Sequence, residues 1–118
     1  MWRYEVSFYE KKDGTQPVKE FLDETDLKMA AKIIQSIDLL KEYGPALREP
    51  YSKPIGNGIF ELRSKAGSDI SRVLYFFVVG RKIILTNGFI KKTQKTPLAQ
   101  IKLAKKYRED YLKRMGEK

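Results

Sequence analysis

The chain has 118 residues, 42% of them hydrophobic, which suits one compact domain with a buried core and excludes global disorder. It contains no cysteine and no histidine, so disulfides, thiolate nucleophiles and imidazole bases or metal ligands are all excluded. Its 24 basic residues exceed its 15 acidic residues, which gives a formal net charge of +9.

The positive charge concentrates toward the C-terminus. Residues 91–118 carry a net charge of +7, and the first 90 residues carry the remaining +2. Such asymmetry indicates a polyanionic partner, of which nucleic acid is the commonest. A lysine-rich helix face exposed to solvent explains the same asymmetry equally well.

The first residues do not resemble a signal peptide, because no apolar stretch follows the start. The longest apolar run, residues 73–79, has the length of a strand and is too short to cross a bilayer. We therefore expect no membrane association and a cytoplasmic location, with which the absence of cysteine agrees.

The N-terminal half predicts a strand followed by two helices. Residues 4–9 alternate in part and predict a strand, and residues 12–15 predict a turn. Pro17 suits the first turn of a short helix, and a longer helix is expected from about residue 26 to residue 43. Gly44 and the proline after it end that helix. We expect the two helices to pack as an antiparallel pair whose apolar stripe covers a sheet.

The C-terminal half predicts three strands and a final helix. Residues 59–65, 71–79 and 82–90 are rich in β-branched and aromatic side chains, and the short turns between them predict an antiparallel meander. Thr96 is the expected N-cap of the last helix, with Pro97 at its first position. One face of this helix is expected to comprise Ile101, Ala104, Arg108, Tyr111 and Met115. The fold class is therefore α+β.

The turns also predict which strand residues face each other. A two-residue loop at Gly67 and Ser68 places Arg63 opposite Arg72, and a loop at residues 80–81 places Arg72 opposite Phe89. Because strand side chains alternate between faces, one face should carry Glu61, Arg63, Arg72, Leu74, Phe89 and Lys91. The other face should supply the core, with Phe60, Leu62, Val73 and Tyr75.

Two arginines directly opposite each other repel, so something must neutralise them. The neighbouring carboxylate of Glu61 is one candidate, and an anionic ligand such as a phosphate is another. Lys91 and Lys92 lie nearby, and the ring of Phe89 offers a platform for a base, so the face suits an unpaired RNA strand. Basic side chains on the solvent side of a sheet are also common without any ligand.

Three segments, residues 57–63 (NGIFELR), 71–76 (SRVLYF) and 88–97 (GFIKKTQKTP), resemble toxins of the HigB type. These toxins belong to the wider RelE/ParE superfamily of toxin–antitoxin modules, and this chain resembles the phage-derived branch. The resemblance spans nearly the whole chain. It implies a single toxin domain over residues 1–118, with an antiparallel sheet packed on two N-terminal helices as in small microbial ribonucleases. It further implies an mRNA endonuclease that acts in the ribosomal A site, and a helix-turn-helix antitoxin of the HigA type as partner.

The resemblance also implies roles for individual residues. Arg63 and Arg72 correspond to catalytic arginines, Lys91 or Lys92 takes another basic catalytic position, and Lys53 resembles a basic RNA-contacting position. Some relatives use histidine or a late tyrosine, but this chain has no histidine and its late tyrosines fall in the final helix. The proton-transfer groups are therefore not assigned by the resemblance.

Cleavage of this kind needs no metal and no cofactor, because the ribose 2′-OH attacks the adjacent phosphate. Arg63 and Arg72 would stabilise the charge that develops in the transition state. A lysine, Lys91 or Lys92, would handle protons, because neighbouring cations lower its pKa. The expected RNA-binding side chains are Lys53, Phe89, Lys95, Lys102, Lys105 and Lys106. A non-enzymatic nucleic-acid-binding module and a gyrase-inhibiting toxin of the ParE type remain as alternatives.

Overall fold

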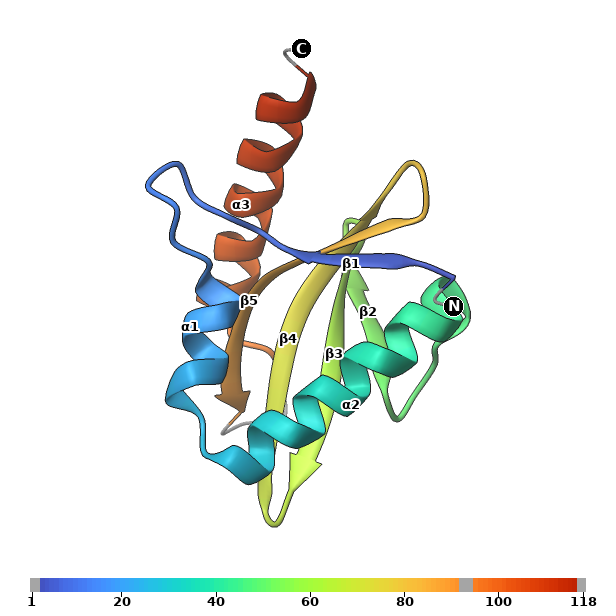
Figure 1. Ribbon diagram of the computed structural model, residues 1–118, viewed down its shortest axis with the longest axis vertical. Helices are drawn as coiled ribbons and strands as arrows, with labels where there is room; N and C mark the ends of the chain where they lie inside the picture. Colours follow the sequence, from blue (N-terminus) through green and yellow to red (C-terminus); the bar gives the residue numbers. More distant parts are fainter. Residues whose placement is uncertain (1–2, 92–94, 117–118) are drawn as a thin grey trace.

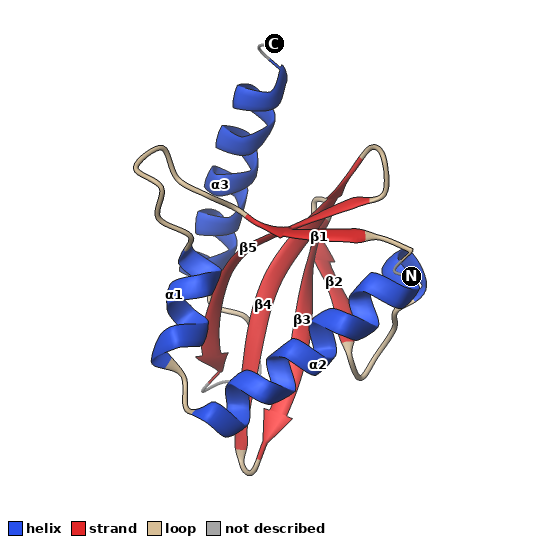
Figure 2. Cartoon of the chain, viewed as in Figure 1, coloured by secondary structure: helices blue, strands red, loops and turns tan. Residues whose placement is uncertain are grey.

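The computed structural model describes residues 3–91 and 95–116, in which two helices cover one face of a five-stranded sheet and a third covers the other (Figure 1). Figure 2 shows the same chain coloured by secondary structure. The elements in chain order are β1 (Glu5–Phe8), α1 (Pro17–Glu24), α2 (Leu27–Tyr43), the short 3₁₀ helix η1 (Gly44–Ala46), β2 (Ser52–Gly56), β3 (Ile59–Ala66), β4 (Asp69–Val78), β5 (Lys82–Lys91) and α3 (Leu98–Gly116). The α+β prediction is confirmed.

The ends of α2 follow from its capping residues. The side chain of Asp26 accepts a hydrogen bond from the backbone N–H of Met29 at 2.8 Å, which satisfies one of the unpaired amides of the first turn. At the other end Gly44 adopts a φ of 49°, and a Cβ at this position would lie 2.5 Å from the ring of Tyr4. Only glycine fits there, so the predicted end of the helix is confirmed.

Both N-terminal helices pack on the sheet. Helix α1 lies mainly against β5 and α2 mainly against β3, where Ile33 and Leu40 are fully buried. Gly88 of β5 allows the close approach of α1, because a Cβ there would lie 2.6 Å from the ring of Phe21. The apolar stripe therefore covers a sheet as expected. The main contacts of both helices are with strands rather than with each other, and Val18 of α1 and Met29 of α2 meet in the same core cluster.

The sheet is larger than the predicted three-stranded meander. Its strand order is β1-β5-β4-β3-β2, and β1 runs parallel to β5. The predicted meander of β3, β4 and β5 is present, and β2, which was not predicted, pairs with β3. Strand β2 is short, contains Pro54 and has mostly exposed side chains, so it lacks the alternating pattern that predicts a strand. Proline is tolerated there because β2 is at the edge of the sheet.

The predicted register of the arginines is confirmed. Ala66 pairs with Asp69, so the β3–β4 loop has two residues, and Arg63 lies opposite Arg72. The β4–β5 loop was predicted to have two residues, which is wrong, because Val78 pairs with Lys82 and three residues lie between them. A bulge on β5, opposite the step from Leu74 to Tyr75 on β4, offsets the extra loop residue, so Arg72 still faces Phe89.

The two faces of the sheet bury different side chains. Leu62, Val73 and Tyr75 join the core beneath α1 and α2, as predicted, and the half-buried Phe60 packs against them. The opposite face buries Leu74 against Ala104 of α3, and Phe76 packs with Tyr107 in a second cluster. The cationic residues lie on this second face.

Helix α3 begins at Leu98, one residue later than predicted, and the hydroxyl of Thr96 donates to Glu61. On the face predicted for this helix, Ala104 is buried and Met115 is exposed, because the end of the helix extends beyond the sheet (Figure 1). Tyr107 is buried as well. No helix within the described ranges combines the length and apolarity that a membrane crossing requires.

Candidate active site

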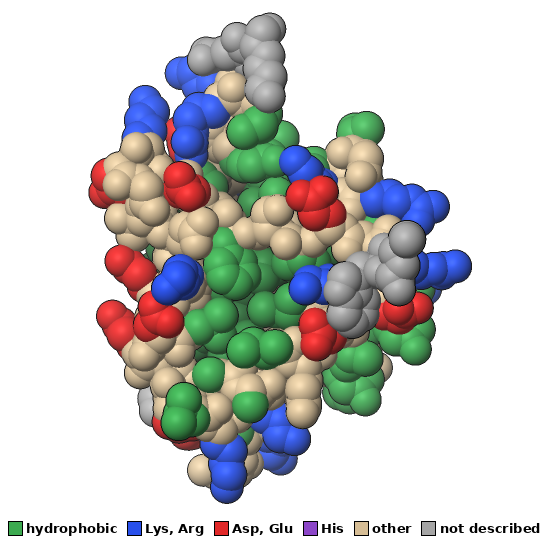
Figure 3. Space-filling view, in the orientation of Figure 1, with side chains coloured by type: hydrophobic (Ala, Val, Ile, Leu, Met, Phe, Trp, Pro, Cys, Tyr) green, Lys and Arg blue, Asp and Glu red, His purple; other side chains and the backbone are tan. Residues whose placement is uncertain are grey.

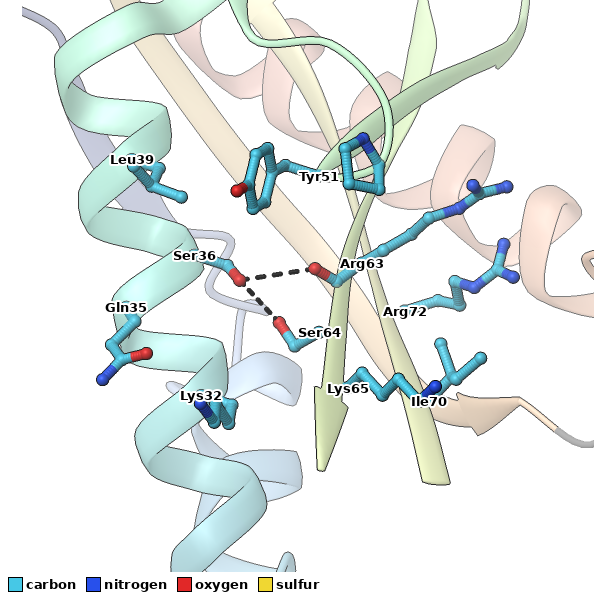
Figure 4. Close-up of a pocket in the computed structure, with 11 residues that line it drawn as sticks. Lys32, Gln35, Ser36, Leu39, Tyr51, Arg63, Ser64, Lys65, Ile70 and Arg72 are labelled. Atoms are coloured by element: carbon cyan, nitrogen blue, oxygen red, sulfur yellow. Dashed lines mark hydrogen bonds between the residues drawn. The ribbon is translucent and has the colours of Figure 1, made fainter. Parts of the chain in front are cut away.

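Arg63 on β3 and Arg72 on β4 form the centre of the candidate site. Their register pairing places them on the same face of the sheet, and Figure 4 shows the two side chains extending side by side, away from α2. Both contact one carboxylate oxygen, Oε2 of Glu61: Nε of Arg63 donates to it at 3.1 Å, and a guanidinium N–H of Arg72 donates to it as well. The expected neutralisation by Glu61 is thus present, and the two guanidinium groups converge.

Glu61 is buried, with 1% of its side chain exposed. Its second oxygen, Oε1, accepts a hydrogen bond from the hydroxyl of Thr96, in the segment that leads into α3. A carboxylate with both oxygens bound in this way is fixed in place, and it fixes the two guanidinium groups in turn. Thr96 therefore connects α3 to the arginine pair, a role that its local sequence did not reveal.

The two arginines differ in their access to solvent. The side chain of Arg63 is 22% exposed, and one of its terminal nitrogens also lies 3.6 Å from Glu49, whereas the side chain of Arg72 is only 6% exposed. Burial lowers the pKa of Arg72, and the adjacent Glu61 opposes that shift. Among the described residues, Nε of Arg72 has no hydrogen-bond partner. Arg63 is consequently the more accessible of the two guanidinium groups.

Lys91 lies at the end of β5, opposite Ile70 and two residues beyond Phe89, which pairs with Arg72. Its pKa lies below the usual lysine value, because partial burial and then the charge of Arg72 disfavour the ammonium form, while Glu61 acts in the opposite direction. The proximity of Lys91 to the arginines was predicted from the register. Lys92 lies outside the described residues.

The other predicted RNA-binding residues surround this centre to different degrees. Lys53 on β2 pairs with Glu61 in register and is exposed, and its charge also lowers the pKa of Lys91. Phe89 is half-buried and packs against the cluster of Ile59, Leu74 and Ala104, so only part of its ring is accessible. Four lysines predicted to bind RNA lie at or along α3, all exposed except the half-buried Lys105: Lys95, Lys102, Lys105 and Lys106.

Charges are mixed on the opposite side of the molecule. Figure 3 views the α1–α2 face, where acidic and basic side chains are interspersed around a hydrophobic centre. Within the part of the chain that is described, no group of three or more acidic side chains could hold a metal ion.

This arrangement defines a small basic α+β protein with two guanidinium groups held on one buried carboxylate. Residues 20–109 match the family of phage-derived Gp49-like proteins (DUF891), and the chain belongs to this family of toxin–antitoxin toxins of the RelE/HigB type. The matched segment includes Lys53, Glu61, Arg63, Arg72 and Lys91. Toxins of this family are generally nucleases. No curated protein matches the chain.

Proposed function

We propose that this toxin is a ribosome-dependent mRNA endonuclease that cleaves RNA without a metal ion and is neutralised by a helix-turn-helix antitoxin of the HigA type. The observation that carries the proposal is the pair of guanidinium groups on Glu61, with the partly accessible Arg63 at its edge and Lys91 beside it. Guanidinium groups bind phosphate oxygens through paired donors and keep their charge at physiological pH. The membership of the chain in a toxin family supports the same assignment.

In this mechanism the ribose 2′ oxygen attacks the adjacent phosphorus, and the bond from phosphorus to the 5′ oxygen of the next nucleotide breaks. The products are a 2′,3′-cyclic phosphate and a free 5′-hydroxyl. Arg63 contacts the phosphate oxygens, whose negative charge increases in the transition state. Arg72, which is buried, acts with Glu61 to hold Arg63 in position.

Lys91 is the proposed proton-transfer group. Its depressed pKa increases the fraction of neutral amine that can accept the 2′-OH proton at physiological pH. The resulting ammonium group can return a proton to the departing 5′ oxygen. Lys53, Lys95 and the α3 lysines bind the RNA backbone of the message and the ribosome.

The proposal is tested by adding the purified protein to a translating extract and mapping the ends of the message. Wild type should produce specific cuts, and Arg63→Ala should reduce cutting by roughly 10²- to 10³-fold. Arg48→Ala is the matched control, because Arg48 is an exposed arginine that makes no contact with Glu61. Equal cutting by wild type and Arg63→Ala would refute the site, and an intact message together with inhibited DNA supercoiling would favour the gyrase alternative.

A further inference from the structure

A pocket of about 460 Å³ lies between α2 and the edge of β3 (Figure 4). Strand β2 pairs with β3 only as far as Ser52 opposite Leu62, and the last backbone contact is the N–H of Arg63 donating to the carbonyl of Tyr51 at 2.8 Å. Beyond Arg63 the remainder of β3 has no neighbouring strand on this side among the described elements. The pocket occupies the space that a longer β2 would have closed.

Its walls are mainly apolar and its floor is polar. Leu39 of α2, Ile70 of β4 and the ring of Tyr51 line it, and 47% of Tyr51 is exposed. At the floor, the hydroxyl of Ser64 donates to that of Ser36 at 2.8 Å, and Ser36 donates to the carbonyl of Arg63 at 3.3 Å. These hydroxyls are held in place by each other, so a ligand meets a preformed polar floor between apolar walls.

The charged residues that line the pocket are all basic: Lys32, Lys65, Arg63 and Arg72. The side chains of Arg63 and Arg72 extend away from α2, and their guanidinium groups donate to Glu61 (Figure 4). Lys32 and Lys65 are exposed at its edges, and Arg63 joins the pocket to the candidate active site. Nε of Arg72 is buried and lacks a hydrogen-bond partner among the described residues, although the side chain borders the pocket. A ligand that combines a flat apolar ring with an attached anion matches these features.

We infer that the pocket binds one nucleobase of the RNA strand whose phosphate lies at Arg63. This inference rests on the proposed function, since it takes the phosphate position from the arginine pair. The base stacks on Tyr51, and its polar edge meets the hydroxyls of Ser36 and Ser64. Lys32 and Lys65 then contact the flanking phosphates. A pocket that holds this base would give the toxin a preference at one position next to the cut.

The experiment uses an RNA trinucleotide that cannot be cleaved, because each ribose carries a 2′-O-methyl group, and the same trinucleotide with each base removed in turn. For wild type, removing the base that occupies the pocket should weaken binding roughly 5- to 150-fold, the range measured for stacking of one base on an aromatic side chain. Tyr51→Ala should weaken binding of the intact trinucleotide by a similar factor. The Tyr51→Ala variant should bind the trinucleotide that lacks this base as tightly as wild type binds it.

Tyr43→Ala is the matched control, since Tyr43 is 51% exposed and does not line the pocket. This variant should bind the intact trinucleotide as wild type does. Leu39→Trp is a second variant, which fills the pocket from α2 and should reproduce the loss seen with Tyr51→Ala. The thermal unfolding of Tyr51→Ala, Tyr43→Ala and Leu39→Trp is first compared with that of wild type.

Three results would overturn the inference. The first is that wild type binds every abasic trinucleotide as tightly as the intact one. The second is that Tyr51→Ala loses the same affinity for the intact and for every abasic trinucleotide. The third is that wild type binds none of these RNAs. The binding assay does not depend on cleavage, so the two proposals fail separately. Message cleavage without coupling between Tyr51 and a base refutes the pocket alone, whereas coupling without cleavage refutes the nuclease assignment alone.

Discussion

Arg63 and Arg72 lie directly opposite each other on neighbouring strands, and both donate to the same oxygen of Glu61. Two like charges at such a position destabilise a sheet unless an anion compensates them. One carboxylate compensates two guanidinium groups only in part. Arg63, Arg72 and Glu61 together therefore carry a net charge of about one positive unit, which the exposed Glu49 beside Arg63 reduces. That residual charge is available to a phosphate at the accessible side of Arg63.

Replacing Glu61 with glutamine should strongly destabilise the fold. The substitution keeps the shape of the side chain but leaves two opposed guanidinium groups without their buried anion. Removing one partner of a buried ion pair typically lowers the free energy of unfolding by about 3–5 kcal/mol. Chemical denaturation measures the difference, and Glu49→Gln, whose side chain is 64% exposed, is the control that should change stability little. An unchanged denaturation midpoint for Glu61→Gln would show that the carboxylate does not hold the cluster together.

The pH dependence of cleavage should reveal Lys91. The neutral amine of any lysine becomes more abundant as pH rises. Because the pKa of Lys91 is lowered from 10.5, this change occurs at a lower pH than for an ordinary lysine. The cleavage rate should therefore increase with pH and then level off. Lys91→Arg keeps the positive charge but cannot lose its proton in this range, so the rise should disappear and the rate should fall roughly 10²- to 10⁴-fold.

Lys82→Arg is the matched control for that experiment. Lys82 lies at the opposite end of β5 and is half-buried like Lys91. The control should keep the wild-type pH profile. If wild type and Lys91→Arg have the same pH profile of cleavage, Lys91 is not the proton-transfer group.

The α3 lysines should account for part of the salt dependence of RNA binding. Lys102 and Lys106 are both exposed on α3, and each phosphate that they neutralise releases a counterion. Changing both to glutamine should reduce the slope of log affinity against log salt by about 0.7 per lysine, the value for a single strand. Lys19 and Lys28, which are exposed on α1 and α2, provide a double variant that should leave the slope unchanged. An unchanged slope for the α3 variant would place the RNA elsewhere.

Tyr9 should make stability sensitive to alkaline pH. Its hydroxyl donates to Asp110 of α3 at 2.6 Å, and burial, followed by this contact, raises its pKa from 10.0 to about 12. The folded state therefore holds the phenolic proton more tightly than the unfolded state. This contribution to stability is complete below pH 10 and is lost as pH rises through about 12.

Tyr9→Phe keeps the ring, which stacks on Tyr107 with centroids 4.6 Å apart, but removes the hydroxyl. The variant should be less stable than wild type at neutral pH, and the difference should shrink at alkaline pH. Denaturation at both pH values measures it. A difference in stability that is the same at both pH values would show that the hydrogen bond from Tyr9 to Asp110 does not couple stability to the ionisation of Tyr9.

Much of this fold is determined locally by the sequence. The two-residue turn at Gly67 and Ser68, together with the alternation of β3 and β4, is sufficient to pair Arg63 with Arg72 and to place Glu61 on the same face. The cap at Asp26 and the glycine at position 44 are sufficient to bound α2. At the turn and at the Asp26 cap, the residues that decide the structure are close in the chain. At Gly44 the positive φ is a local preference of glycine, to which the ring of Tyr4 adds a tertiary constraint.

The tertiary structure alone decided the remainder. The parallel pairing of β1 with β5, the edge strand β2, the contact of Thr96 with Glu61 and the pocket beside Tyr51 each join segments that are distant in the chain or lack a periodic pattern. Such contacts leave no pattern in the residues that make them. The entropic cost of closing the loop depends only weakly on its length, and the stabilisation comes from the surfaces that meet. Sequence reasoning could therefore predict the arginine pair, whereas the burial of Glu61 and the unequal exposure of the two arginines followed only from how α3 and β2 pack around them.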